Sequence, residues 1–316
     1  MLYFPGCAVL ILLRWRDERS GVDSLTHVLA VMLAAHNTLS GPYLFALVLG
    51  AVIPDIDILF KPFSDRHPSL YMFTHGGVTH SIPGAVAMAP LVLTGSAVAV
   101  AGGAFPVPDQ GFTWVLMGIF FIFGTFTHLF LDALAYPGIP LLYPVSPQKY
   151  TVGIFPGPSL VIFAASLIFA TLFLLGSGAP TLIWIYAAFF ILFILASGGI
   201  ALAVRAGTRG RAIPTLHPLR WFILAEDDEK YILSSVNLLS EPGPEQIFPK
   251  YRNTTPQQLD EVVKRPEYQR LKFYSYIITA NRDGDQVVFT DPLRAGRIIF
   301  YPPYYTEIAL PAPETA

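Results

Sequence analysis

The chain has 316 residues, of which 53% are hydrophobic and only 13% are charged, and its formal net charge is −2. The mean hydropathy is +0.52. Soluble globular proteins carry about 25% charged residues, so the whole chain is not an ordinary soluble domain. The near-neutral balance, without an extended basic face, gives no reason to expect nucleic-acid binding. The single cysteine, Cys7, excludes an intrachain disulfide and a cysteine-based zinc site.

The charged residues are unevenly distributed along the chain. Residues 1–204 contain 6 Lys+Arg and 8 Asp+Glu, whereas residues 205–316 contain 14 of each. We therefore expect a membrane domain at 22–204, followed by a polar domain at 205–316 that is long enough to fold alone. Residues 1–21 are an N-terminal extension whose apolar part is too short to span a bilayer. The sequence leaves open whether this extension belongs to the native protein.

Apolar segments near the length of a membrane span recur through the first 204 residues. The first is the weakest and opens with an N-cap signal at Asp23 and Ser24. In chain order the candidate spans are 23–39, 42–60, 83–103, 113–136, 157–176 and 181–204. The expected fold class is an all-α multi-span membrane helical bundle of about six spans, with a C-terminal soluble α+β domain.

The positions of the positive charges predict how the chain is oriented in the membrane. Arg205, Arg209 and Arg211 directly follow the last span, which places the C-terminal domain in the cytoplasm by the positive-inside rule. With six spans, the loops 61–82, with Lys61 and Arg66, and 137–156, with Lys149, also lie inside, as do the arginines of residues 14–19. We expect a multi-pass protein of the cell membrane with a cytoplasmic C-terminal domain.

The polar domain shows a pattern typical of mixed helices and strands. Its predicted elements are two strands, a helix that ends before Pro266, and a hairpin that turns across an Asn-Arg-Asp-Gly sequence. In chain order they cover 221–224, 231–239, 255–265, and 273–279 with 286–290. This pattern indicates an α+β accessory domain, and we find no catalytic constellation in it.

Six of the seven histidines lie between residues 27 and 128, within or beside the predicted spans. Ionisable groups at membrane depth usually face the interior of a bundle and mark a site. Imidazole and carboxylate together suit zinc, manganese or iron. His128 and Asp132 are four residues apart, so they share one helix face and can bind one ion or bridge two. Asp23 and His27 repeat this spacing, although Asp23 can equally cap the helix.

Asp55 and Asp57 follow the second apolar run, directly after Pro54. Two carboxylates this close repel each other unless a cation lies nearby. Either both bind the ion, or one of them orients a histidine that binds it. His75 and His80 bracket two glycines, which allow the backbone to wrap closely around an ion. By the predicted topology all these groups lie at the cytoplasmic side of the membrane.

The remaining polar residues of this region have weaker claims to a site. Thr79 and Ser81 are able to hydrogen-bond the ligands or to contact an anionic substrate. His67 precedes Pro68 in a polar loop, so we expect it to be solvated. His36 falls toward the opposite membrane face, so we expect an interfacial or core histidine.

Four motifs carry a resemblance to a known family. They are Asp23-Ser-Leu-Thr-His27, Leu49-Gly-Ala-Val-Ile-Pro-Asp-Ile-Asp57, His75-Gly-Gly-Val-Thr-His-Ser81 and His128-Leu-Phe-Leu-Asp132 with the following residues to Pro144. In order and spacing, over about residues 22–150, they resemble the YdjM-type family of membrane-bound metal-dependent hydrolases. The polar tail is similar to that of longer family members.

The resemblance implies a metal site and a related fold. The matching positions implied as metal ligands are His27, Asp55 or Asp57, His75, His80, His128 and Asp132. A distant relation to the zinc-dependent phospholipase C fold, an all-helical scaffold with a multinuclear site, is also implied. One position departs from the family pattern: Gly76 stands where members usually have arginine, which would be a natural phosphate clamp.

Three functions are compatible with these features. We favour a metal-dependent hydrolase of a phosphoester, lipid-linked or of small-molecule type, acting at the bilayer surface. Its cofactor would be zinc, with manganese or iron as alternatives, and Asp57 or Asp23 would act as the base. The second is a metal-stabilised anchor or sensor that presents residues 205–316 to a protein partner. The third is an ion or proton transporter, whose path toward the outer face has only His36 and Asp109 as candidates.

Overall fold

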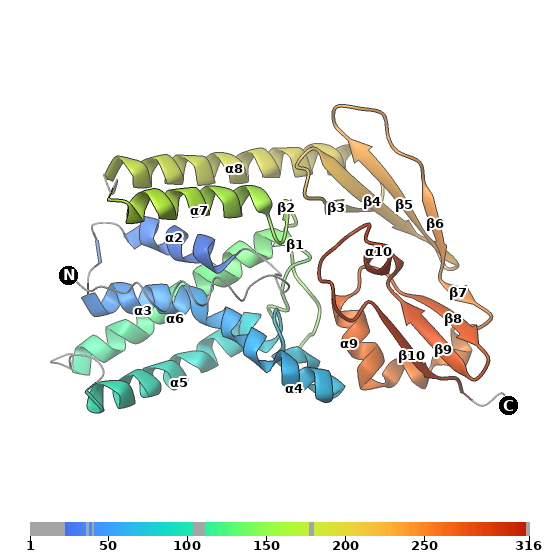
Figure 1. Cartoon of the computed structure of the whole chain (residues 1–316), viewed down its shortest axis with the longest axis horizontal. Helices are drawn as coiled ribbons and strands as arrows, with labels where there is room; N and C mark the ends of the chain where they lie inside the picture. Colours follow the sequence, from blue (N-terminus) through green and yellow to red (C-terminus); the bar gives the residue numbers. More distant parts are fainter. Residues whose placement is uncertain (1–22, 36–37, 40, 104–110, 177–179, 314–316) are drawn as a thin grey trace. The chain divides into compact units, whose positions relative to one another are not determined.

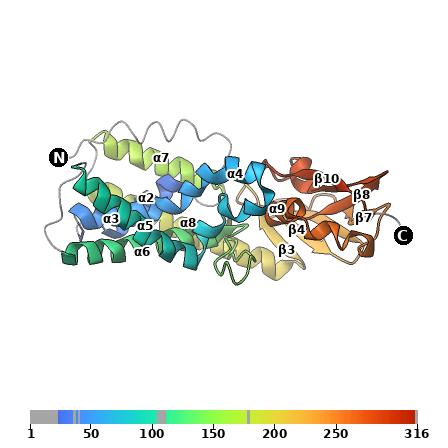
Figure 2. The same cartoon turned by 90° about the horizontal axis from the view of Figure 1, so that it is seen from below.

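The computed structural model describes residues 23–35, 38–39, 41–103, 111–176 and 180–313, and Figures 1 and 2 show it from two sides. His36, Asp109 and the extension 1–21 lie outside the described residues. Two compact units can be separated by their internal contacts. The helical unit consists of Gly21–Ala225 with Ile232–Gln246, and the C-terminal unit contains Glu226–Tyr231 and Ile247–Ala316. The boundary at residue 204 between the membrane domain and the polar domain stays a prediction.

The first part of the chain is helical, as its composition predicts. The helices are α2 (Ser24–Ala35), α3 (Gly41–Val52), α4 (Lys61–Arg66), α5 (Ile82–Ala101), α6 (Gly111–Leu134), α7 (Leu160–Leu174) and α8 (Pro180–Gly207). Three short 3₁₀ segments, η1 (Ile53–Phe60), η2 (Pro68–Phe73) and η3 (Val78–His80), connect α3 to α5 around α4. Prolines at the first turns of η1, α4 and η2 explain this broken course, because proline starts a helix readily and interrupts one that is already running.

Three apolar helical stretches among the described residues are long enough to cross a membrane. They are Gly41–Arg66, Thr113–Leu134 and Pro180–Gly207, of 26, 22 and 28 residues. The apolar helices Ser24–Ala35, Ile82–Val98 and Leu160–Leu174 are shorter. Each of the six predicted spans thus contains an apolar helix, while the count of six spans stays a prediction.

Helices α3 and α6 approach each other closely because glycines lie at their crossing. A Cβ atom added to Gly50 would lie 2.1 Å from the carbonyl oxygen of Phe121. A Cβ atom on Gly124 would lie 2.0 Å from the carbonyl oxygen of Leu47. Close helix packing through small residues is common in membrane bundles. Here it brings the backbone of Ala51 beside α6, where the metal-ligand candidates of α6 are located.

The strands form three small sheets. A parallel pair joins β1 (Ala135–Tyr136) to β2 (Phe155–Pro156), with Ala135 opposite Phe155. A four-stranded sheet has the order β3-β4-β5-β6, with bounds Arg211–Pro214, Arg220–Glu226, Lys230–Asn237 and Gln246–Pro249. Trp221 and Ile223 of β4 pack in the core of the helical unit. The strands predicted at 221–224 and 231–239 are confirmed, with shifts of a few residues at their ends.

The C-terminal unit, predicted to be α+β, is β-rich and also contains short helices. Its sheet has the order β10-β9-β8-β7, with bounds Glu307–Pro311, Gln286–Thr290, Thr279–Asp283 and Tyr251–Arg252. The helical elements are η4 (Gln257–Leu259), η5 (Val262–Lys264), α9 (Pro266–Tyr274) and α10 (Pro292–Ala295). Leu271 of α9 packs in the apolar core with Val287 and Phe289 of β9.

Two local predictions in this unit are wrong. The helix predicted at 255–265 is two 3₁₀ turns, and Pro266 starts α9 instead of ending a helix. Proline is favoured at the first helical position, where its missing N–H is not needed. The first hairpin strand lies at Thr279–Asp283 instead of 273–279, because residues to Tyr274 belong to α9. The turn then falls at Gly284, whose φ of 60° suits glycine.

Candidate metal centre

Four segments of the helical unit bring the predicted ligands together. The first turns of α2 supply His27, η1 supplies Asp55 and Asp57, the η2–η3 region supplies His75 and His80, and the end of α6 supplies His128 and Asp132. These seven side chains are at most 10% exposed. Within the described chain they make up three overlapping groups whose ligand atoms are close enough to hold a cation. All seven residues predicted as ligands therefore lie in one cluster.

The central feature of the cluster is a cage of four ligand atoms. The Nε2 atoms of His80 and His128 are 3.3 Å apart. The Oδ1 atom of Asp55 is 3.5 Å from each of these nitrogens, and the Oδ2 atom of Asp132 is 3.4 Å from each. Ligand atoms placed about 2.0–2.2 Å from a tetrahedral ion lie about 3.4 Å from one another. The spacing therefore allows His80 and His128 to share a cation with Asp55 on one side or with Asp132 on the other.

The far nitrogens of both cage histidines are held by hydrogen bonds. Nδ1 of His128 is 2.8 Å from the carbonyl oxygen of Ala51 and donates to it. Nδ1 of His80 is 3.1 Å from Oδ2 of Asp57. Metal-binding histidines typically donate their second N–H to a carbonyl or a carboxylate, which fixes the ring and its tautomer. Both Nε2 lone pairs are thereby directed into the cage.

Asp57 accepts hydrogen bonds from several neighbours at the edge of the cage. His75 Nδ1 lies 2.9 Å from its Oδ1 atom, and the Gly76 N–H donates to its Oδ2 atom at 3.2 Å. The hydroxyl of Thr79 also donates to Oδ2, as predicted for a residue that supports the ligands. With His80 as a further partner, Asp57 has the contacts of a carboxylate that orients histidines, one of the two alternatives derived from the sequence.

Incomplete ligand sets lie on two sides of the cage. On one side, His27 Nε2 is 3.4 Å from Oδ1 of Asp132, the oxygen that faces away from the cage. The His27 ring stacks on His128 with centroids 3.8 Å apart. On the other side, His75 Nδ1 is 3.8 Å from Oδ1 of Asp55. Asp132 is thus placed to share a second cation with His27 through its outer oxygen, whereas the His75 nitrogen that faces Asp55 also hydrogen-bonds Asp57.

The loop histidines are embedded in negative charge. Burial alone lowers the pKa of His80, but the charges and hydrogen bonds of Asp57 and Asp55 outweigh it and raise the pKa well above 6.5. Burial and the adjacent Asp57 act on His75 in the same opposing way, and its pKa is also raised. An excess of carboxylates thus stabilises positive charge here, as either protons or a metal cation.

Some polar residues near the cluster have structural contacts instead. Asp23 caps α2: its carboxylate accepts from the backbone N–H of Thr26 at 3.0 Å and from the Thr26 hydroxyl at 2.8 Å. It belongs to none of the three ligand groups. Ser81 caps α5 by accepting from the Gly84 N–H at 3.0 Å. His67 is exposed, as expected for a solvated loop residue.

Two supports of the centre were not anticipated from the sequence. The Ser24 hydroxyl donates to Oδ2 of Asp55, although the sequence signal at Ser24 indicates only a helix cap. The carbonyl oxygen of Ala51 belongs to the backbone, so the type of residue at position 51 does not predict its hydrogen bond with His128. Only the crossing of α3 and α6 brings it to His128.

The fold and the cluster define a membrane protein with a buried His/Asp site whose donors suit a divalent cation. The comparison with family models leads to the same class. The model described as YdjM inner membrane protein matches residues 22–205, more than half of the chain. The chain belongs to this family. No curated protein and no solved structure matches it.

Proposed function

We propose that the protein is a membrane-bound metal-dependent hydrolase of a phosphoester, acting on a lipid-linked or small substrate at the cytoplasmic face. The observation that supports this most is the cage of two histidines and two aspartates, with His27 next to one aspartate and His75 next to the other. A cage with four protein ligands alone is typical of a structural ion, whereas catalytic ions keep open positions. The flanking sets at His27 and at His75 leave such positions for water and substrate.

The residues have distinct roles in this proposal. His80, His128, Asp55 and Asp132 would hold the central ion, and their donor set suits zinc, with manganese or iron as alternatives. Bound divalent cations lower the pKa of a coordinated water and polarise the bond that is broken. Asp57 keeps two histidines oriented, and Asp23 fixes the start of α2. With Asp57 and Asp23 in these roles, we assign the proton acceptor of the reaction to a carboxylate next to His27 or His75.

Six membrane spans with a cytoplasmic C-terminal domain belong to the same proposal. Arg205 follows the apolar core of α8, and its guanidinium donates to the carbonyl groups of Val152 and Gly153 at 2.6 and 3.0 Å. This contact supports a common membrane side for the end of α8 and the loop after α6. The ligands His128 and Asp132 lie near that same end of α6. Positive charge and metal centre then share the cytoplasmic side.

The test combines metal content with hydrolysis on full-length, detergent-solubilised protein. Wild type is expected to hold two or more equivalents of zinc or manganese and to cleave a phosphodiester such as bis(p-nitrophenyl) phosphate. His75→Ala/His128→Ala removes ligands from the cage and one flank, so both metal and hydrolysis should be lost while circular dichroism keeps its helical signal. A wild type purified without chelators that holds no metal above background contradicts the proposal.

One observation favours a second candidate, a metal-stabilised anchor: the cage already offers two histidines and two aspartates as ligands for a structural ion. His27→Ala distinguishes the two, because His27 lies outside the cage. If the protein is a hydrolase, the His27→Ala variant should be stable and keep the central ion. It should lose the ion that His27 binds, and with it the hydrolysis. The anchor predicts a single ion in wild type, unchanged in His27→Ala, and a bundle that unfolds in His128→Ala.

A further inference from the structure

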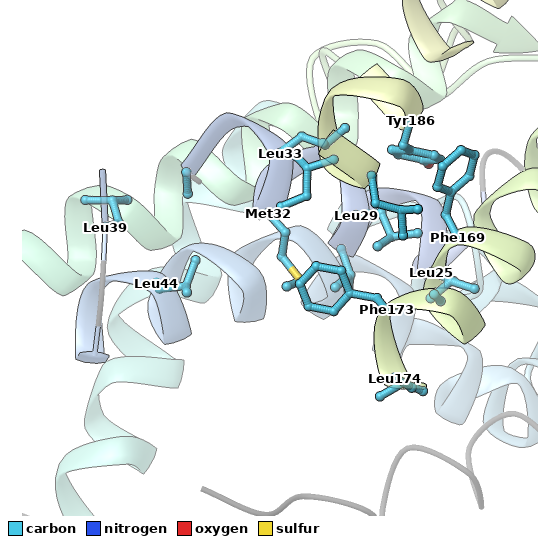
Figure 3. Close-up of a pocket in the computed structure, with 15 residues that line it drawn as sticks. Leu25, Leu29, Met32, Leu33, Leu39, Leu44, Phe169, Phe173, Leu174 and Tyr186 are labelled. Atoms are coloured by element: carbon cyan, nitrogen blue, oxygen red, sulfur yellow. The ribbon is translucent and has the colours of Figure 1, made fainter. Parts of the chain in front are cut away.

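An apolar groove runs along α2 and is lined by residues of α2, α7 and α8; in Figure 1, α7 lies next to α2 and α8 lies beyond α7. Its volume is about 400 Å³, within the range of small-molecule sites. The side chains that form its walls are drawn in Figure 3, where Leu39 and Leu44 lie at the opposite end from Tyr186 and Phe169. No charged residue lines it.

The groove has the length of one membrane leaflet. Its lining begins at Leu25, close to the start of α2, continues through Met32 to Ala35, and includes Leu39 beyond the helix. From Leu25 to Ala35 a helix rises about 15 Å. The hydrocarbon core of a bilayer is about 30 Å thick, so this stretch corresponds to about half of the core.

The chemistry of the walls excludes water as the natural occupant. Tyr186 contributes its ring, while its hydroxyl hydrogen-bonds Ser166 at 2.8 Å. Ser166 in turn hydrogen-bonds Thr26 at 2.7 Å. Water in such an apolar space finds no polar partners. An empty cavity would destabilise the bundle in proportion to its volume, whereas the hydrocarbon that surrounds membrane helices can fill it.

We propose that this groove binds one hydrocarbon chain of a membrane phospholipid, with the headgroup at the end of α2 that carries the metal centre. The lipid site is distinct from that centre, because His27 leaves α2 toward Asp132 of α6, while Leu25 and Leu29 face the groove. The lipid is held whether or not it is cleaved. The inference therefore goes beyond the proposed hydrolase function.

Ala170 offers a way to fill the groove, and Ala164 a matched control. Both alanines belong to α7, but Ala170 lines the groove whereas Ala164 is exposed on the helix surface. Ala170→Trp places an indole where the chain would bind. Ala164→Trp adds the same side chain toward the surrounding lipid. A third variant, Leu29→Asn, makes the wall polar without adding volume.

The measurement is native mass spectrometry of the full-length protein in mild detergent, titrated with palmitoyl-oleoyl-phosphatidylglycerol. Wild type and Ala164→Trp should retain one phospholipid per chain. Ala170→Trp and Leu29→Asn should bind it more weakly by about tenfold or more, because each methylene group that leaves an apolar site costs affinity.

Two results overturn the proposal. The first is a wild type that retains no phospholipid, as would follow if another segment of the chain fills the groove. The second is equal retention by all four proteins. If circular dichroism shows that Ala170→Trp or Leu29→Asn has lost its fold, the other of these two variants tests the proposal. Since the readout is lipid retention, a protein that binds lipid but hydrolyses nothing contradicts the proposed hydrolase and leaves the groove assignment intact.

Discussion

Replacing Asp57 by asparagine tests whether this carboxylate orients histidines or binds the cation itself. Asp57 is fully buried and lies 2.9 Å from His75 Nδ1 and 3.1 Å from His80 Nδ1. An asparagine can still accept one of these hydrogen bonds through its amide oxygen, but it lacks the negative charge. Loss of such a supporting group typically weakens metal binding 10–100-fold, about 1.4–2.8 kcal/mol. We therefore expect Asp57→Asn to hold the ion with affinity lowered by that factor.

The assay is a competition titration of the solubilised protein with a zinc chelator, run beside two reference variants. Asp55→Asn removes a cage ligand and should lose more affinity than Asp57→Asn. Asp65→Asn changes an exposed carboxylate that pairs with Lys61 at 2.8 Å, and it should bind zinc as wild type does. If Asp57→Asn is as damaging as Asp55→Asn, Asp57 is a ligand. If it matches Asp65→Asn, the orienting role is refuted.

Three further predictions concern stability. Gly124→Ala would force a Cβ atom to within 2.0 Å of an α3 carbonyl oxygen. It should destabilise the bundle by about 1–3 kcal/mol or more in thermal unfolding. The control Gly95→Ala should have little effect, because open space surrounds Gly95. Asp291→Ala leaves the buried Arg294 without the carboxylate that is 2.7 Å from its Nε. The free energy of unfolding of the C-terminal unit, measured in urea, should fall by about 3–5 kcal/mol. A decrease below about 1 kcal/mol would contradict this. Burial raises the pKa of Tyr268 to about 12, so its contribution to stability should be complete below pH 10 and lost between about pH 10 and 12. Absorbance titration should show one fewer late-titrating phenol in Tyr268→Phe than in wild type.

Several features of the protein follow from its residues without any knowledge of the fold. Apolar runs of near-spanning length predict a membrane bundle, because backbone polar groups in lipid must bond within their own helix. The seven ligand candidates could be selected because an ionisable group inside such a bundle needs a partner. The spacing of His128 and Asp132 placed both on one helix face, and their cage atoms indeed lie next to each other and to His80 Nε2.

Other features depend on contacts between residues that are far apart in the chain. The sequence left the roles of Asp55 and Asp57 interchangeable, and only the course of η1 directs one into the cage and the other toward the far side of His80. Asp23 had the spacing of a ligand but is engaged by Thr26. In the C-terminal unit, Pro266 was predicted to end a helix but begins α9, whose Leu271 packs in the apolar core.

The sequence by itself determined the membrane character of the chain and the set of ligand candidates, because hydrophobic length and unpaired charge are local properties. Tertiary structure alone decided the pairing of atoms in the metal centre. Gly50 and Gly124 allow two backbones to approach until the Ala51 carbonyl meets His128. The groove along α2 is decided in the same way, since its walls come from separate helices. Both depend on how helices pack, and residue spacing within one segment does not specify that packing.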